Sequence, residues 1–124
     1  MIIAVDFDGT CVDHRFPEVG PDAPDSVTSL RALHAAGHEL ILWTMRSGKP
    51  LDDAVAWFAS KGIPLYGING NPDQHTWTKS PKAYAQIYID DAALGCPLIE
   101  LASFKRKCVD WVSVMAILMT VGQE

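Results

Sequence analysis

Apolar residues along the chain form short runs that polar and glycine-containing stretches separate. Residues 1–5 (MIIAV) and residues 40–43 (LILW) contain no charged residue, which predicts two short strands buried on both faces. Residues 63–68 predict a weaker strand, residues 86–89 a further strand, and residues 96–99 a last edge segment. Each run is four to six residues long, which is typical of strands rather than helices.

Between these runs the apolar residues recur with helical spacing. Residues 26–36 place Val27, Leu30 and Leu33 on one face, with Asp25 positioned to cap the helix and Gly37 to end it. Residues 51–60 predict a second helix and residues 82–85 a helical turn. A largely apolar helix of about 14 residues is predicted near the end of the given sequence. Strands that alternate with helices predict an α/β fold. We expect residues 1–124 to form a single-domain, Rossmann-like three-layer sandwich with a mostly parallel sheet.

Polar side chains of a particular kind follow three of the predicted strands. Asp6-Phe7-Asp8-Gly9-Thr10 follows the first strand, Thr44 ends the second, and Asp90-Asp91 ends the strand at residues 86–89. The carboxyl ends of parallel strands meet at one edge of a sheet, so these residues should converge there. Four carboxylates in one pocket repel each other unless a cation lies between them. Oxygen-only ligands favour a hard ion such as Mg²⁺.

Composition and charge narrow the possible partners and location. The net charge of −5 gives no basic surface for nucleic acid. The most apolar late segment, residues 109–121, is too short for a membrane span and contains Asp110. The chain starts directly with a predicted strand, without the pattern of a secretory signal. Three widely spaced cysteines (Cys11, Cys96 and Cys108) favour reduced thiols. A cytoplasmic protein that binds neither nucleic acid nor membrane is therefore expected.

These motifs resemble those of the haloacid dehalogenase (HAD) superfamily. DFDGT after an apolar strand, a threonine ending the second strand, a lysine, and DD ending a later strand correspond in order to its four motifs. The resemblance covers roughly residues 1–95, and LWTMRSG and YIDDAALG are similar to sequences of small capless members. The resemblance implies a Mg²⁺-dependent phosphatase that acts on a phosphorylated small molecule or macromolecule.

The resemblance also implies a role for each motif residue. Asp6 is the expected nucleophile, which forms an aspartyl-phosphate, and Asp8 the expected general acid and base. The metal is expected to bind the Asp6 carboxylate, the Asp8 backbone carbonyl and Asp90, with Asp91 binding directly or through water. Thr44 is expected to donate a hydrogen bond to a phosphoryl oxygen.

Lys82 is the expected positive charge beside the nucleophile, with Lys79 as the alternative. Arg46 and Ser47 directly follow Thr44, so either is a candidate substrate contact. The intervals between motifs have no room for a cap domain. We therefore expect an open site, closed only by residues 11–24, by residues 69–78 or by a neighbouring subunit. The missing cap and the apolar last helix also suggest a homo-oligomer.

Two other functions would use similar residues, and four histidines lie outside the motifs. A response-regulator receiver domain has similar residues, but its acidic pair comes first and its phosphate acceptor at the third strand, unlike the order here. A non-catalytic metal- or phosphate-binding protein with the same fold is the second alternative. His14 and His75 lie in loops and are possible substrate contacts. His34 and His38 are four residues apart but have no evident third ligand, so a metal site is not expected there.

Overall fold

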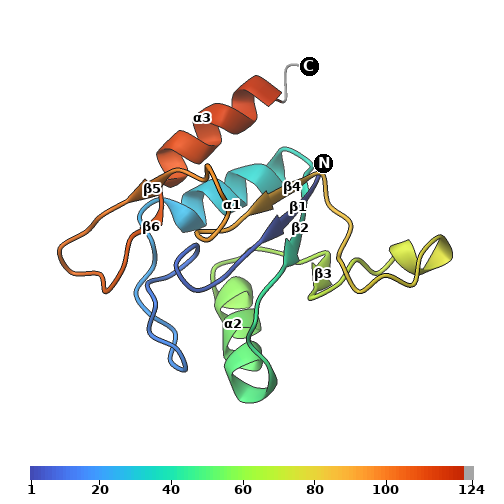
Figure 1. Ribbon diagram of the computed structural model, residues 1–124, viewed down its shortest axis with the longest axis horizontal. Coiled ribbons are helices and arrows are strands. Elements are labelled where there is room, and N and C mark those ends of the chain that lie inside the picture. Colours follow the sequence, from blue (N-terminus) through green and yellow to red (C-terminus); the bar gives the residue numbers. More distant parts are fainter. Residues whose placement is uncertain (122–124) are drawn as a thin grey trace.

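The computed structural model describes residues 1–121. Its central element is a parallel sheet of four strands in the order β3-β2-β1-β4 (Figure 1). The strands are β1 (Ile2–Val5), β2 (Glu39–Leu42), β3 (Gly67–Ile68) and β4 (Ile87–Ile89). Ala4 of β1 is paired with Ile41 of β2 and with Tyr88 of β4. The first strand therefore lies inside the sheet, and its carboxyl end lies between those of β2 and β4.

Two helices connect the first three strands. They are α1 (Ser26–Ala35), between β1 and β2, and α2 (Gly48–Ser60), between β2 and β3. Because parallel crossovers are right-handed and both connections step in the same direction, both helices pack on the same face of the sheet. The core on this face joins Ile3 and Val5 with Leu30 of α1 and Phe58 of α2. The predicted Rossmann-like α/β class is therefore confirmed.

Residues 69–86, which connect β3 to β4, form a largely exposed segment that extends to one side of the sheet (Figure 1). This segment contains only one turn of 3₁₀ helix, η1 (Gln74–Thr76), and residues 82–85 are not helical as predicted. The side chain of Gln74 holds the segment together, donating to the carbonyls of Ser80 and Lys82 and accepting from the Tyr84 N–H. The Tyr88 hydroxyl then donates to the Ala83 carbonyl and attaches the segment to β4.

The chain after residue 95 forms two short strands and a helix that pack beside the sheet and share its core. The strands β5 (Leu98–Ile99) and β6 (Cys108–Val109) form an antiparallel pair, so residues 96–99 do not join the edge of the main sheet as predicted. Helix α3 (Trp111–Val121) follows, and Asp110 caps its first turn by accepting from the Ser113 N–H and hydroxyl. Helix α3 packs beside α1 (Figure 1).

Several predicted boundaries differ from the structure. Asp25 precedes α1 in a left-handed conformation (φ 64°), and its side chain makes no capping hydrogen bond. Helix α2 begins at Gly48, three residues earlier than predicted, because the turn after β2 is tighter than expected. The strand predicted at residues 63–68 is shorter in the structure, where only Gly67–Ile68 forms a strand at the edge of the sheet. Within residues 1–121, no helix has the length and apolar character needed to cross a membrane.

Candidate functional site

Three carboxylates meet at the carboxyl end of the sheet. Asp6 follows β1, and Asp90 and Asp91 follow β4, so the parallel pairing of these strands brings them together although 84 positions separate Asp6 from Asp90. One oxygen of each side chain lies within 4.8 Å of an oxygen of the other two. We call these three residues the acidic cluster. The structure thus brings together the strand-end residues Asp6, Asp90 and Asp91.

The surroundings of the acidic cluster favour protonation of Asp6 and Asp90 when no cation is present. Burial, together with the neighbouring Asp90 and Asp91 carboxyls, raises the pKa of Asp6 to about 8. Burial and the Asp91 carboxyl also raise the pKa of Asp90. A divalent cation would relieve this repulsion, and the donor set consists only of oxygen, as Mg²⁺ prefers. The residues of the acidic cluster therefore fit the ion that the HAD resemblance implies.

The turn after β1 requires glycine at position 9 and positions the cluster through Thr10. Gly9 has a positive φ of 81°, and a Cβ atom there would overlap both the His14 ring and the Asp91 carboxylate. The imidazole Nε2 of His14 lies 2.8 Å from Asp91 Oδ2. The Thr10 hydroxyl donates to Asp6 Oδ2 over 3.2 Å and accepts the Asp91 N–H at the same distance. Thr10 thus connects the two parts of the acidic cluster.

Asp8 is held by a buried arginine. Arg46 Nε and Nη2 donate to the two Asp8 oxygens over 2.9 and 2.8 Å. The remaining N–H groups of Arg46 donate to the carbonyls of Pro17, Glu18 and Pro50. Only 3% of Arg46 is exposed, and all five of its guanidinium donors are used within the protein. The predicted substrate contact at Arg46 is therefore wrong, because no donor remains for a ligand.

Thr44 lies at the end of β2, as predicted, and is fixed by a residue outside the expected motifs. Its N–H donates to Asn69 Oδ1 over 2.7 Å, and its hydroxyl accepts the Arg46 N–H over 3.2 Å. Asn69 follows β3 in the left-handed conformation (φ 51°), which asparagine tolerates better than most residues. The exposed Ser47 precedes α2, and its side chain makes no capping bond.

The carboxyl-terminal part of the chain braces the acidic turn. Trp111 of α3 is buried, and its indole N–H donates to the Thr10 carbonyl over 2.7 Å. The Val109 N–H donates to the Gly9 carbonyl over 3.0 Å. Sequence reasoning missed both contacts, and the only signal was a tryptophan at the start of an otherwise aliphatic helix.

A second brace ties the loop at residues 11–24 to the segment before β6. Asp13 is fully buried and accepts from the Lys105 N–H, the His14 N–H and the Arg15 side chain. Burial alone would raise the pKa of Asp13, but these hydrogen bonds together lower it below its usual value. This loop therefore has a fixed conformation beside the site.

Other predicted site residues do not join the acidic cluster. Within residues 1–121, neither Lys79 nor Lys82 forms an ion pair, and Lys82 Nζ lies 5.5 Å from the centre of the Tyr88 ring. The prediction of Lys82 beside Asp6 is not supported. Lys82 belongs to the irregular segment at residues 69–86, whose path places its ammonium group over the Tyr88 ring. His75 lies on η1 in the same segment (yellow in Figure 1), far from the loop at residues 11–24 (blue).

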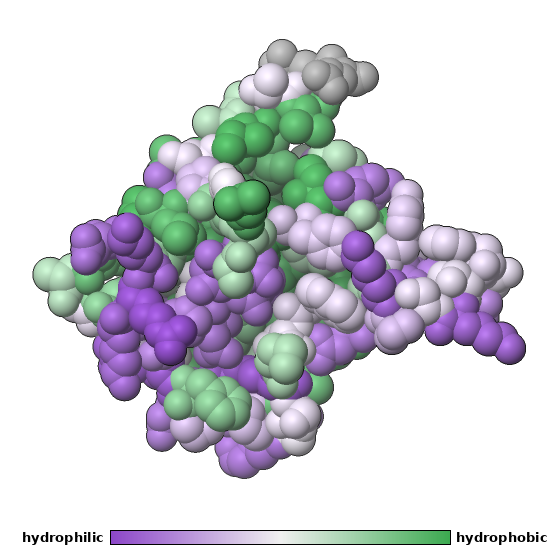
Figure 2. All heavy atoms as spheres, in the orientation of Figure 1, coloured by the Kyte–Doolittle hydropathy of each residue, from purple (hydrophilic) through white to green (hydrophobic). Residues whose placement is uncertain are grey.

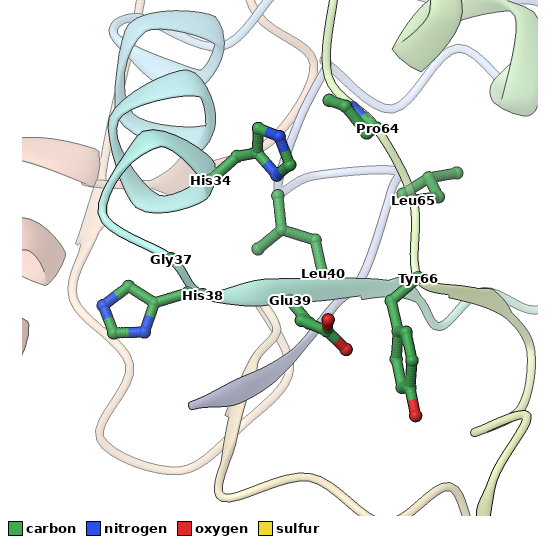
Figure 3. A pocket seen from close by; sticks show the side chains of 8 residues that line it. All are labelled: His34, Gly37, His38, Glu39, Leu40, Pro64, Leu65 and Tyr66. Atoms are coloured by element: carbon green, nitrogen blue, oxygen red, sulfur yellow. The ribbon is translucent and has the colours of Figure 1, made fainter.

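A cavity of about 380 Å³ lies elsewhere, beside the amino end of β2 (Figure 3). Its wall includes His34 and His38, whose rings point to different sides in Figure 3, and Tyr66. His38 Nδ1 lies 2.9 Å from the amine of Met1, and burial together with that amine lowers the pKa of His38. The two imidazoles therefore do not converge on one point in this cavity.

Comparison with known proteins gives one informative match. The chain is similar to a solved structure described as that of a conserved protein coded by a locus from Bacteroides thetaiotaomicron, with 36% sequence identity and a TM-score of 0.80. The match covers 97% of this chain and 90% of the Bacteroides chain. The two proteins belong to one family. No protein-family model matches the chain, and neither does any curated protein.

Proposed function

We propose that the protein is a Mg²⁺-dependent phosphohydrolase of the HAD type that acts through an aspartyl-phosphate on Asp6. The observation that carries this proposal is the acidic cluster, three carboxylates from two neighbouring parallel strands within 4.8 Å. The raised pKa of Asp6 supports it, because such crowding is unfavourable for stability alone and is relieved by a cation. Bound Mg²⁺ supplies positive charge that stabilises the transferring phosphoryl group.

The proposed reaction has two displacements at phosphorus. The reaction begins with Asp6 ionised and Asp8 protonated. An Asp6 oxygen forms a bond to phosphorus while the bond from phosphorus to the leaving-group oxygen breaks, and Asp8 gives that oxygen its proton and becomes a carboxylate. Water then attacks the same phosphorus, Asp8 takes its proton, and the bond between phosphorus and Asp6 breaks. Inorganic phosphate and the alcohol are released, and both aspartates return to their starting state.

The contacts of Asp8 and Thr44 are compatible with these roles. Arg46 occupies one lone pair on each Asp8 oxygen, which leaves a second lone pair on each that can hold the transferred proton. The guanidinium stabilises the ionised form of Asp8, which is the form that takes the proton from water in the second displacement. The Thr44 hydroxyl accepts a hydrogen bond from the backbone N–H of Arg46, so the hydroxyl proton is free to point toward a phosphoryl oxygen. Arg46 therefore acts in this proposal as a positioning residue for both side chains.

The test is turnover of a generic aryl phosphate by the purified protein. We expect hydrolysis that requires Mg²⁺, stops when the metal is chelated, and is abolished by Asp6→Asn, which keeps the shape of the side chain but removes its nucleophilic charge. Metal-independent hydrolysis, or an Asp6→Asn variant with the normal rate, would overturn the mechanism.

One observation favours a second candidate, a metal- or phosphate-binding protein without turnover. Asp6 has no cationic side chain paired with it among residues 1–121, whereas the HAD resemblance implies a lysine there. Mg²⁺ binding without hydrolysis of any phosphorylated sugar, nucleotide or sugar acid would favour this candidate. A phosphoprotein that persists for minutes would instead favour a signalling role.

A further inference from the structure

Helix α3 leaves an apolar surface uncovered. No residue of Trp111–Val121 is charged, and its outer side exposes Val112 (66%), Ile117 (51%) and Met119 (66%). Figure 2 shows hydrophobic side chains gathered over this helix and the chain next to it. Helices on the surface of a monomer normally turn a polar face to solvent, so this one has the composition of a helix in an interface.

The apolar surface continues from α3 onto the segment after β4. A groove of about 220 Å³ separates the two and is lined by Ile117 on one side and Leu94 on the other. Leu94 is fully exposed although it follows the acidic cluster by only three residues. We call the exposed apolar residues of α3 together with Leu94 the α3 patch, which consists of Leu94, Val112, Ala116, Ile117, Met119 and Val121. Ile117 lies on the flank of α3 that faces Leu94, and Met119 lies on the opposite flank, which faces α1.

We propose that the α3 patch is the contact surface of a homodimer. The exposed fractions of its residues correspond to on the order of 600 Å² of apolar surface. In a standard interface each partner buries ~800 Å², polar and apolar surface together. The half-buried Ser113 and the exposed Thr120 lie on the same helix and add polar surface. The apolar part of the patch is somewhat smaller than a standard interface, which corresponds to a dimer of moderate affinity.

The arrangement of residues on α3 fits a second copy of the same chain. Val112, Ala116 and Thr120 are four residues apart and form the stripe that points directly away from the buried Val114 and Leu118. An antiparallel pair of α3 helices across a two-fold axis would place Ala116 on Ala116 and Val112 on Thr120, two side chains of nearly equal shape. The small side chain at the centre allows close approach of the helices.

Charge supports the same occupant. Each chain carries a net charge of −5, so two copies meet at the lowest electrostatic cost through a surface that brings no like charges into contact. The α3 patch contains no charged side chain and brings no like charges together. The inner side of α3 carries Trp111, which holds the Thr10 carbonyl, so the dimer would also fix the helix that braces the acidic turn. This inference does not depend on the proposed phosphohydrolase activity.

The test is the molar mass in solution, measured by sedimentation equilibrium over a range of protein concentrations. We expect the wild-type chain to be a dimer with a micromolar or lower dissociation constant. Ala116→Glu should weaken it at least ~100-fold, because two carboxylates would meet at the two-fold axis. Ala116 is exposed within the chain, so the circular dichroism spectrum of the variant should stay unchanged.

The matched control is Ala56→Glu, which introduces the same charge at an exposed alanine of α2. This variant should dimerise like the wild type. A wild-type chain that stays monomeric at ~100 μM, whether or not it binds some other protein, would overturn the proposal. A dimer that Ala116→Glu leaves intact, or that both variants weaken equally, would place the interface elsewhere and also overturn it.

Discussion

Replacing Arg46 by methionine should destabilise the protein strongly, although the residue lies in a turn between two elements. Methionine is similar in length and has no charge, so it keeps much of the packing between the rings of Phe7 and Phe16, which lie 5.0 and 5.3 Å from the guanidinium carbon. It removes five hydrogen bonds and leaves the Asp8 carboxylate, with an 18% exposed side chain, without a partner.

The size of the effect follows from the burial of this pair. Breaking a buried ion pair by removing one partner costs about 3–5 kcal/mol, because the remaining charge keeps its desolvation penalty. For a chain of this length each kcal/mol lowers the melting temperature by roughly 3–5 °C, so we expect a decrease of about 10–20 °C. Circular dichroism during heating, with denaturant titration for the free energy of unfolding, measures both quantities.

A double-mutant cycle separates the pair from its surroundings. Asp8→Asn alone should also destabilise the protein. The Arg46→Met/Asp8→Asn double variant should lose about 1–3 kcal/mol less free energy of unfolding than the sum of the losses of the two single variants. Lys49→Met is the control, since the Lys49–Asp53 pair is exposed and is worth less than about 0.5 kcal/mol. A cost below about 1 kcal/mol for Arg46→Met, or strictly additive costs, would refute this account of Arg46.

Three further predictions concern the acidic turn and its braces. Trp111→Phe should cost about 1–2 kcal/mol in the free energy of unfolding because the Thr10 carbonyl loses its buried donor, and a cost near zero in denaturant titration would contradict the brace. The pKa of Asp13 is lower in the folded than in the unfolded state (near 4), so its carboxylate stabilises the fold above pH 4, and this stabilisation is lost as pH falls through the folded-state pKa. The difference in free energy of unfolding between wild type and Asp13→Asn should therefore shrink below pH 4, and a difference that stays constant would contradict the hydrogen bonding of Asp13. The pKa of Asp6 is about 8 in the folded state, so the metal-free protein should lose stability as pH rises from about 4 to 8. The increase in melting temperature on adding Mg²⁺ should therefore grow over that range. An increase in melting temperature that does not depend on pH would contradict the crowding of the acidic cluster.

The parts of the site that sequence predicted are those fixed by local rules. Asp6, Thr44 and Asp90 each follow a short apolar run, and parallel pairing brings the ends of such runs to one edge of a sheet. The alternation of strands and helices likewise predicted the α/β class. These inferences need only the period of the apolar residues and the handedness of the crossovers.

The parts that sequence did not predict depend on the path of the chain through space. Lys82 is preferred over Lys79 for its spacing before Asp90, but its ammonium group lies over the Tyr88 ring. Arg46, like Ser47, is a candidate substrate contact because it follows Thr44, whereas three backbone carbonyls and Asp8 take all of its guanidinium donors. The contact between Trp111 and Thr10 joins residues 101 positions apart, and no local pattern encodes it.

The central claim is that Asp6 carries the phosphoryl group, and trapping that intermediate tests it most directly. The wild-type protein is mixed with Mg²⁺ and an aryl phosphate, quenched in acid during turnover, digested and analysed by mass spectrometry. The account predicts one hydroxylamine-sensitive phosphopeptide that contains Asp6 and is absent from Asp6→Asn and from the chelated sample. A phosphoryl group on a different residue, or steady turnover without any phosphorylated Asp6, would contradict it.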